Sequence, residues 1–238
     1  MKVLVIVPAY NEEASIVKTS QSIEEYKKKA NFTLDYIVIN DGSTDSTGNI
    51  LEKNSIPCIH LIKNLGIGGA VQTGYIYAHE NGYDIAVQFD GDGQHDIYSL
   101  DTLIAPIVND DYDFVIGSRF TKESPSDFKT SFSRRMGINL ISFFIKLKTG
   151  KEILDVTSGY RAANRSVIEM FAKSYPRKYP EPETNAYLLL LDKKVTEVGV
   201  KMFEREEGKS SITPIKSVRY MVEVLISIIL LNKNRRNK

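Results

Sequence analysis

Short apolar segments alternate with longer segments of helical periodicity through the first half of this 238-residue sequence. Strands that are apolar at every position must be covered on both faces, as in a parallel sheet between two helical layers. The alternation therefore predicts an α/β fold with a mostly parallel central sheet flanked by helices. The predicted strands are 3–7, 36–39, 59–62, 85–89 and 114–116, and the predicted helices are 12–29, 44–54, 68–81 and 100–108.

Polar clusters follow four of these predicted strands, at the points where the strands end. Ligands of doubly wound sheets bind beyond the carboxyl ends of the strands. We therefore expect the four clusters to share one edge of the sheet and to form a site of nucleotide size. The clusters are Pro8-Ala9-Tyr10-Asn11-Glu12, Asn40-Asp41-Gly42-Ser43, Lys63-Asn64-Leu65-Gly66 and Asp90-Gly91-Asp92.

The bulk composition excludes several classes of protein. The formal net charge is +1, so the chain lacks the overall positive field that favours nucleic acid. Cys58 is the sole cysteine, which rules out an internal disulfide and suits a buried packing role. No stretch of the sequence reaches the roughly 18 apolar residues expected of a membrane-spanning helix.

Two carboxylates, Asp90 and Asp92, lie one residue apart directly after a predicted buried strand. They can converge on one hard cation, because Mg²⁺ or Mn²⁺ binds one or two carboxylates and completes its shell with water and phosphate oxygens. Gly91 and Gly93 remove side-chain bulk where a ligand would approach. Asp-Gly pairs are also ordinary turn residues, so a simple turn is the alternative.

Two other edge clusters have both a ligand-binding and a structural interpretation. Asp41 can accept a hydrogen bond from a base or ribose, while Ser43 or Thr44 can cap a helix with Asp45 near its dipole. The segment 66–69 is glycine-rich, but it lacks the Gly-Lys-Ser/Thr and the spacing of nucleotide-binding loops. We interpret it as close backbone approach at a helix start.

Seven motifs in order along 3–211 together resemble the family 2 glycosyltransferases with the GT-A fold. The branch that they resemble most contains dolichyl- and polyprenyl-phosphate sugar transferases and related bacterial polysaccharide transferases. The ordered set is specific, although each motif alone is weak. The motifs are Pro8-Ala9-Tyr10-Asn11-Glu12, Asn40-Asp41-Gly42-Ser43-Thr44-Asp45, Asn64-Leu65-Gly66, Asp90-Gly91-Asp92-Gly93-Gln94, Gly117-Ser118-Arg119, Asp155-Val156-Thr157-Ser158-Gly159-Tyr160-Arg161 and Arg205-Glu206-Glu207-Gly208-Lys209-Ser210.

The resemblance implies a UDP-, GDP- or dTDP-linked sugar donor and a transfer that inverts the anomeric carbon. It matches Asp90, Asp92 and Gln94 to ligands of Mg²⁺ or Mn²⁺. Arg134 or Arg135 is a further cation that could clamp a phosphate. The donor-binding residues that it implies are Pro8, Tyr10, Glu12, Asp41, Gly66, Asp90, Gly91, Asp92, Arg119 and Arg205.

The catalytic base depends on the acceptor. A hydroxyl acceptor needs a base, whereas a phosphate acceptor is already an anion and needs none. Glu183 is our first choice, because Pro182 places it at a helix start in the region where hydroxyl-using relatives carry a catalytic acid. Asp155 and Glu181 compete with it. The structural alternatives are a helix-start charge for Glu183, and for Asp155 a turn or an ion pair with Arg161.

The second half of the sequence is less regular than the first. We expect a loop over 121–133 and a helix over 134–148. A turn is expected within 153–165, and an irregular segment over 175–182 because it holds three prolines. A further helix is expected from 183 to 191. The apolar stripe predicted for the helix at 134–148 consists of Ile138, Ile141, Phe144, Ile145 and Leu147.

The segment 215–231 is apolar but is interrupted by three charged residues, which makes it too short and too charged to cross a bilayer. It is long enough to lie in a membrane surface, and the basic residues within 233–238 would favour anionic lipid. The alternative is a helix packed on the core or on a second subunit of a homodimer. We therefore divide the chain into a GT-A domain, 1–211, and an amphipathic helix with a basic tail, 212–238.

Together these observations favour a metal-dependent, inverting hexosyl- or deoxyhexosyltransferase at the inner face of the cell membrane, on the cytoplasmic side. It would transfer a sugar to a lipid-linked or growing glycan acceptor in polysaccharide synthesis. The first alternative is direct transfer to polyprenyl phosphate. The second is a non-catalytic subunit that binds a nucleotide sugar.

Overall fold

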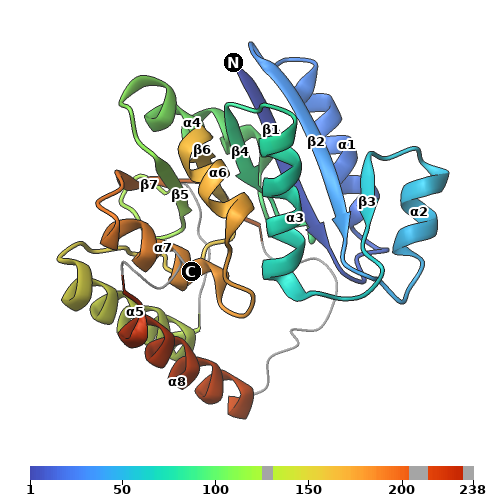
Figure 1. Ribbon diagram of the computed structural model, residues 1–238. Coiled ribbons are helices and arrows are strands. Elements are labelled where there is room, and N and C mark those ends of the chain that lie inside the picture. The colour runs from blue at the N-terminus through green and yellow to red at the C-terminus, as the bar shows by residue number, and fades with distance from the viewer. Residues whose placement is uncertain (125–130, 204–213, 233–238) are drawn as a thin grey trace.

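A computed structural model describes residues 1–124, 131–203 and 214–232 of the chain (Figure 1). The strands are β1 (Lys2–Ala9), β2 (Thr33–Asn40), β3 (Cys58–His60), β4 (Ile85–Gln88), β5 (Phe114–Ser118), β6 (Arg161–Asn164) and β7 (Val195–Gly199). The helices are α1 (Ile16–Lys27), α2 (Thr47–Lys53), α3 (Gly66–Glu80), α4 (Leu100–Asn109), α5 (Phe132–Thr149), α6 (Arg165–Lys173), α7 (Pro180–Leu190) and α8 (Pro214–Leu230), with a short 3₁₀ helix at Ile97–Ser99.

The strands of the described residues form one sheet in the order β3-β2-β1-β4-β6-β5-β7. Every neighbouring pair is parallel except those of β6, which runs antiparallel to both β4 and β5. Helices cover both faces of this sheet, and α3 and α6 lie side by side on one of them (Figure 1). The predicted α/β fold with a mostly parallel sheet is confirmed.

Strand β1 shows why both faces must be covered. Leu4 and Ile6 point into the core under α3, α5, α6 and α7, whereas Val3, Val5 and Val7 point into the core under α1 and α4. All five side chains are fully buried. A strand alternates its side chains between two faces, so an uninterrupted apolar run supplies both cores at once.

The second half departs from the sequence expectations in three elements that were not predicted, namely β6, α6 and β7. Helix α7 also begins at Pro180, inside the segment expected to be irregular. Prolines in the first turn of a helix break no hydrogen bond, because the first N–H groups have no partner within the helix. The prolines at 180 and 182 therefore start the helix.

Helix α5 carries a different apolar stripe from the predicted one. Ile138, Ile141 and Ile145 are buried as expected, but the side chain of Leu147 is 72% exposed. Residue 147 lies six positions after Ile141, which is well off the same face at 3.6 residues per turn. The helix ends at Gly150, whose φ of 75° is a left-handed conformation that suits glycine.

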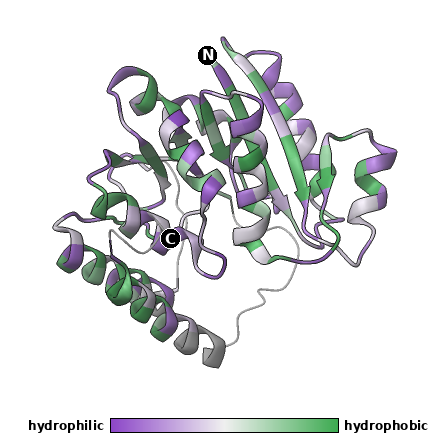
Figure 2. Cartoon of the chain, viewed as in Figure 1, coloured by the Kyte–Doolittle hydropathy of each residue, from purple (hydrophilic) through white to green (hydrophobic). Residues whose placement is uncertain are grey.

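Helix α8 packs one face against the protein and exposes the other. Hydrophobic and hydrophilic residues are interspersed along the helix (Figure 2). Val224, Ile228 and Leu231 are buried in the same core as the inner face of α5. The exposed apolar residues lie on the opposite side and are Val222, Ile226, Ile229 and Leu230. The helix is therefore amphipathic, as predicted, and its inner face is part of the core.

The domain boundary predicted between residues 211 and 212 lies outside the described residues. No helix of the described residues is both long enough and apolar enough to cross a membrane.

We predict that Ile228→Ala lowers the free energy of unfolding by about 2–5 kcal/mol, because it leaves a cavity in the core between α5 and α8. Ile226→Ala removes the same atoms two residues earlier from a half-exposed site and should change stability by about 0.5 kcal/mol or less. Urea unfolding of both variants measures the difference. Equal effects would show that α8 is not packed on the core.

Candidate active site

The four polar clusters lie at the edge of the sheet where the parallel strands end. The clusters are joined directly, since the Leu65 N–H donates to Asp41 Oδ1 at 2.7 Å. A Cβ atom added to Gly91 would lie 3.1 Å from the Pro8 carbonyl oxygen. Strand β6 begins at the same edge, because it runs antiparallel and pairs Arg161 with Gln88. The single shared edge agrees with the sequence analysis.

The loops after β1 and β2 are tied together by hydrogen bonds between their backbones and side chains. Asn11 adopts a left-handed φ of 56°, and its N–H donates to Ser43 Oγ at 3.0 Å. In return, the Thr44 N–H donates to Asn11 Oδ1 at 2.8 Å. The Glu12 N–H donates to Thr47 Oγ1 at 2.9 Å. These bonds hold Asn11 in a conformation that few non-glycine residues adopt.

The helix start predicted around Ser43 and Thr44 is wrong in detail. Helix α2 begins at Thr47, and the side chain of Asp45 accepts the Thr47 N–H at 2.9 Å. Ser43 instead accepts a bond from the first loop. Because the helix starts later than expected, the whole segment from 41 to 46 remains loop at the mouth of the site.

The predicted base- and ribose-binding residues differ in their exposure. Asp41 is 3% exposed, and burial raises the pKa of its carboxyl group. Tyr10 is 46% exposed at the edge, whereas Pro8 is buried beneath it. The Glu12 carboxylate accepts a hydrogen bond from Ser15 Oγ at 2.9 Å, just before α1. Tyr10 is therefore the surface against which a flat base can stack.

Gly66 lies at the same edge of the sheet, at the start of α3. Gly66 has a left-handed φ of 79°, and its N–H donates to Asn64 Oδ1 at 3.0 Å. A Cβ added to Gly68 would lie 2.1 Å from the Pro176 carbonyl oxygen. The start of α3 is thus held by close backbone contact with the segment before α7, which agrees with our interpretation of this glycine-rich stretch.

The acidic loop after β4 presents two carboxylates. Asp90 Oδ1 accepts from Gln88 Nε2 at 3.4 Å, and Asp92 Oδ1 accepts the Gln94 N–H at 3.1 Å. A Cβ on Gly159 would lie 2.5 Å from Asp90 Oδ2, so a larger residue at this position would displace the carboxylate. The described residues contain no cluster of three or more His, Cys, Asp or Glu side chains around one point. Two carboxylates fit Mg²⁺ or Mn²⁺, which take their remaining ligands from water and phosphate.

His95 supports this loop. Its Nδ1 accepts the backbone N–H of Asp90 at 3.0 Å, and its ring stacks on Tyr160 with 4.8 Å between centroids. Burial lowers the pKa of His95.

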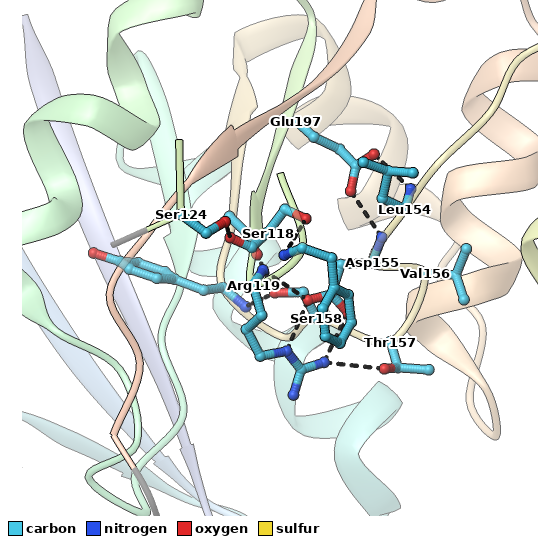
Figure 3. A network of polar contacts seen from close by, with 12 residues as sticks. Ser118, Arg119, Ser124, Leu154, Asp155, Val156, Thr157, Ser158 and Glu197 are labelled. Atoms are coloured by element: carbon cyan, nitrogen blue, oxygen red, sulfur yellow. Dashed lines mark hydrogen bonds and ion pairs between the residues drawn. The ribbon is translucent and has the colours of Figure 1, made fainter. Parts of the chain in front are cut away.

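An ion pair between Arg119 and Asp155 fixes the loop before β6 to the end of β5 (Figure 3). Arg119 Nε and Nη2 each contact an oxygen of Asp155 at 2.7 Å, and the Arg119 N–H donates to Oδ2 at 3.0 Å. Glu197 accepts the N–H of Asp155 at 2.8 Å, and burial raises the pKa of Glu197.

Asp155 is therefore a partner of Arg119 and not of Arg161, the partner that the sequence analysis offered. It is 0% exposed, and both of its oxygens bond to one guanidinium. Such a carboxylate lies poorly for taking a proton from an acceptor.

The two glutamates at the start of α7 face different surroundings. Glu181 Oε1 lies 3.9 Å from Arg161 Nη2. Burial raises the pKa of Glu181, and the nearby charge of Asp90 adds to this shift. Glu183 instead lines a groove of about 540 Å³ with residues of α8 such as Glu223. The structure thus brings Glu181 to the acidic loop, although Glu183 was our first choice.

Basic residues lie beside this edge at the start of α5. Ser131 caps the helix by accepting the Arg134 N–H at 3.4 Å, and the Arg135 guanidinium lies 3.7 Å from the centroid of Phe120. Burial and the charge of Arg119 both lower the pKa of Arg134, so these two cations share one region. Arg205, also predicted to bind the donor, lies outside the described residues.

Sequence reasoning missed the contact between Arg161 and Gln88, which are paired across β6 and β4. Arg161 is 0% exposed, and Gln88 is 1% exposed. Gln88 carried a signal in the sequence, because it is the polar residue within the apolar run 85–89. Such residues need partners when buried.

Comparisons with known proteins agree with this geometry. The family described as "Glycosyl transferase family 2" matches residues 4–171. A UDP-N-acetylglucosamine–dolichyl-phosphate N-acetylglucosaminyltransferase from Methanococcus voltae is 31% identical and covers 86% of each chain. An undecaprenyl-phosphate mannosyltransferase from Micrococcus luteus is 29% identical and covers 90% of this chain and 88% of its own.

Among solved structures, the fold is similar to glucosyl-3-phosphoglycerate synthase from Mycobacterium tuberculosis in complex with Mn²⁺, UDP-glucose and phosphoglyceric acid. The TM-score is 0.65 at 20% identity, with 95% of this chain and 79% of that chain covered. At this identity the similarity shows the fold alone.

We predict that Asp155→Asn lowers the free energy of unfolding by about 3–5 kcal/mol, because it leaves a buried guanidinium without its counter-charge. Thr157→Val removes only the 3.2 Å contact from Arg119 Nη2 and should cost about 0.5–1.5 kcal/mol. Urea unfolding measures both. If the two variants lost similar, small amounts, the ion pair would not be what holds this loop.

Proposed function

The chain belongs to glycosyl transferase family 2, and on that premise we propose that this glycosyltransferase moves a sugar from a nucleoside diphosphate to the phosphate of a membrane polyprenol. The observation that carries the proposal is the placement of an acidic loop and a group of arginines at the same sheet edge. Asp90 and Asp92 suit a metal-bound diphosphate, and Arg134, which lies in the same region as the paired Arg119, suits a second anion.

The donor would lie across the ends of β1, β2 and β4. Tyr10 would stack on the base of the donor, and Asp41 would accept a hydrogen bond from an N–H group of that base. Asp90 and Asp92 with Gln94 would hold Mg²⁺ or Mn²⁺. A bound divalent cation would neutralise the charge that develops on the leaving diphosphate. UDP occurs in the name of the relative from Methanococcus voltae, and this favours UDP over GDP or dTDP.

The acceptor is the part of the proposal that differs most from our sequence interpretation, which put a lipid-linked or growing glycan first. Both named relatives use polyprenyl-type phosphates. A phosphate oxygen can attack the anomeric carbon while the bond to the diphosphate breaks, with inversion and without a base. The structure fits this, because Asp155 is engaged by Arg119 and Glu183 lines the groove beside α8.

Glu181 is the remaining carboxylate near the acidic loop, so it discriminates between acceptor classes. We predict that Glu181→Gln keeps turnover within a few-fold when undecaprenyl phosphate is the acceptor. A base for a hydroxyl acceptor would instead contribute roughly 10²–10⁴-fold. The assay follows transfer from radiolabelled UDP-sugars to undecaprenyl phosphate in detergent or to soluble oligosaccharides.

Glu183→Gln is the matched control, because it makes the same charge change in the same helical turn. A hundredfold loss in Glu181→Gln, with Glu183→Gln unaffected, would contradict the phosphate acceptor and make Glu181 the base.

We also propose that the enzyme lies on the inner face of the cell membrane through α5 and α8. The two helices run side by side, since a Cβ on Gly137 would lie 3.0 Å from Met221 Sδ, and Lys148 Nζ donates to the Ile229 carbonyl at 2.6 Å. Basic residues within 233–238 follow α8 directly in the sequence. Both helices expose apolar side chains, namely Met136, Leu140, Phe143 and Leu147 on α5, and Val222, Ile226, Ile229 and Leu230 on α8.

We predict that Phe143→Ser and Ile226→Ser each weaken binding to phosphatidylglycerol-containing vesicles by roughly ten- to a hundredfold, because each removes one inserted apolar side chain. Ile62→Ser is the matched control, since Ile62 is fully exposed in the loop after β3. Vesicle co-sedimentation at low and high salt measures the effect. If full-length protein ignores vesicles and these variants break a dimer instead, the surface is a subunit interface.

A further inference from the structure

We propose that Arg161 and Gln88 position Asp90 for metal binding by fixing its carboxylate from below. This inference rests on the proposed metal site, and it adds two residues that touch neither donor nor acceptor. Both lie in neighbouring strands, where β4 and β6 pair Gln88 directly with Arg161.

Arg161 is a cation without access to water. Its Nη1 donates to Thr184 Oγ1 at 2.7 Å, and its Nη2 donates to Gln88 Oε1 at 2.6 Å and to Tyr175 Oη at 2.7 Å. Glu181, at 3.9 Å, is the acid paired with it among the described residues. The guanidinium is thus held on three sides by side chains from β4, α7 and the segment before α7.

This arrangement fixes the orientation of the Gln88 side-chain amide. A guanidinium has only donors, so the Gln88 atom that it contacts must be the carbonyl oxygen. The amide nitrogen is then turned toward Asp90 Oδ1, at 3.4 Å, and can only donate. Arg161 therefore makes Gln88 a donor to the two nearby acids, Asp90 and Glu181.

The Asp90 carboxylate is confined from two directions. Gln88 Nε2 lies 3.4 Å from Oδ1. Oδ2 lies 3.6 Å from His95 Nε2 and faces Gly159, where a Cβ would be only 2.5 Å away. A ligand that is already oriented loses less freedom when a metal binds, and outer partners of this kind typically contribute 10–100-fold to metal affinity. Arg161 also places a positive charge 3.9 Å from the Glu181 carboxylate.

The test is Gln88→Met, which keeps the length of the side chain and removes the amide. We expect the affinity for Mn²⁺, titrated by electron paramagnetic resonance with UDP present, to fall roughly 10–100-fold. Tyr175→Phe is the matched control. It also deprives Arg161 Nη2 of one partner, but Tyr175 packs against Tyr75 and Phe171 in the core. It should lose similar stability in urea and keep its Mn²⁺ affinity.

Two further variants keep the outcome clear. Arg161→Lys retains the buried charge but cannot bridge Gln88, Thr184 and Tyr175, and it should weaken Mn²⁺ binding even if Gln88→Met does not fold. Asp92→Asn removes one proposed metal ligand, so it gives the Mn²⁺ affinity of the protein without an intact metal site. If wild-type protein binds Mn²⁺ no better than Asp92→Asn, the metal site itself fails and this inference with it. A second outcome overturns only the positioning role. In that outcome wild type binds Mn²⁺, and Gln88→Met or Arg161→Lys binds it as tightly as wild type or as Tyr175→Phe.

Discussion

Two buried arginines hold together the edge of the sheet where the parallel strands end. A desolvated guanidinium must find its hydrogen bonds and counter-charge within the protein. Arg119 holds Asp155 and with it the loop that enters β6. Arg161, at the start of β6, joins that strand to Gln88 on β4 and to Thr184 on α7. The antiparallel strand is thus anchored at its first residue, beside the ends of the parallel strands.

The edge is built in two parts that differ in character. On the side of β1 and β2, backbone N–H groups and short polar side chains tie the loops together, as in the contacts of Asn11 with Ser43 and Thr44. On the side of β5 and β6, charged side chains make the ties. The first part suits a neutral, flat base, and the second suits phosphates, which carry charge and need cations. The acidic loop at Asp90 lies between the two.

The sequence predicted the first half of the fold and the clusters at the edge because both are local properties. Apolar runs define strands, and strand ends in a parallel sheet must meet at one edge. The second half depends on contacts between distant residues. Strand β6 is polar at both ends, so its sequence does not resemble a buried strand. It becomes one by pairing with β4, where Arg161 lies opposite Gln88 and Asn164 lies opposite Ile85.

Glu181 and Glu183 show the same limit at the level of the site. Residues two apart on a helix point to nearly opposite sides, so only one of them can face the acidic loop. Which one it is depends on where the helix begins. We placed the start at 183, but the prolines at 180 and 182 extend it by three residues. The extension places Glu181 in the first helical turn, on nearly the opposite side from Glu183.

The packing of α8 has a consequence for which lipids the proposed enzyme would accept. Val224, Ile228 and Leu231 are buried in the core, so the outward face of the helix is fixed relative to the rest of the domain. The arginines at the start of α5 would then stand at a constant height above the bilayer. Polyprenols with few or many isoprene units would present the same phosphate at that height, while the remainder of the chain stayed in the membrane. Selection would therefore fall on the head group, with wide tolerance for chain length.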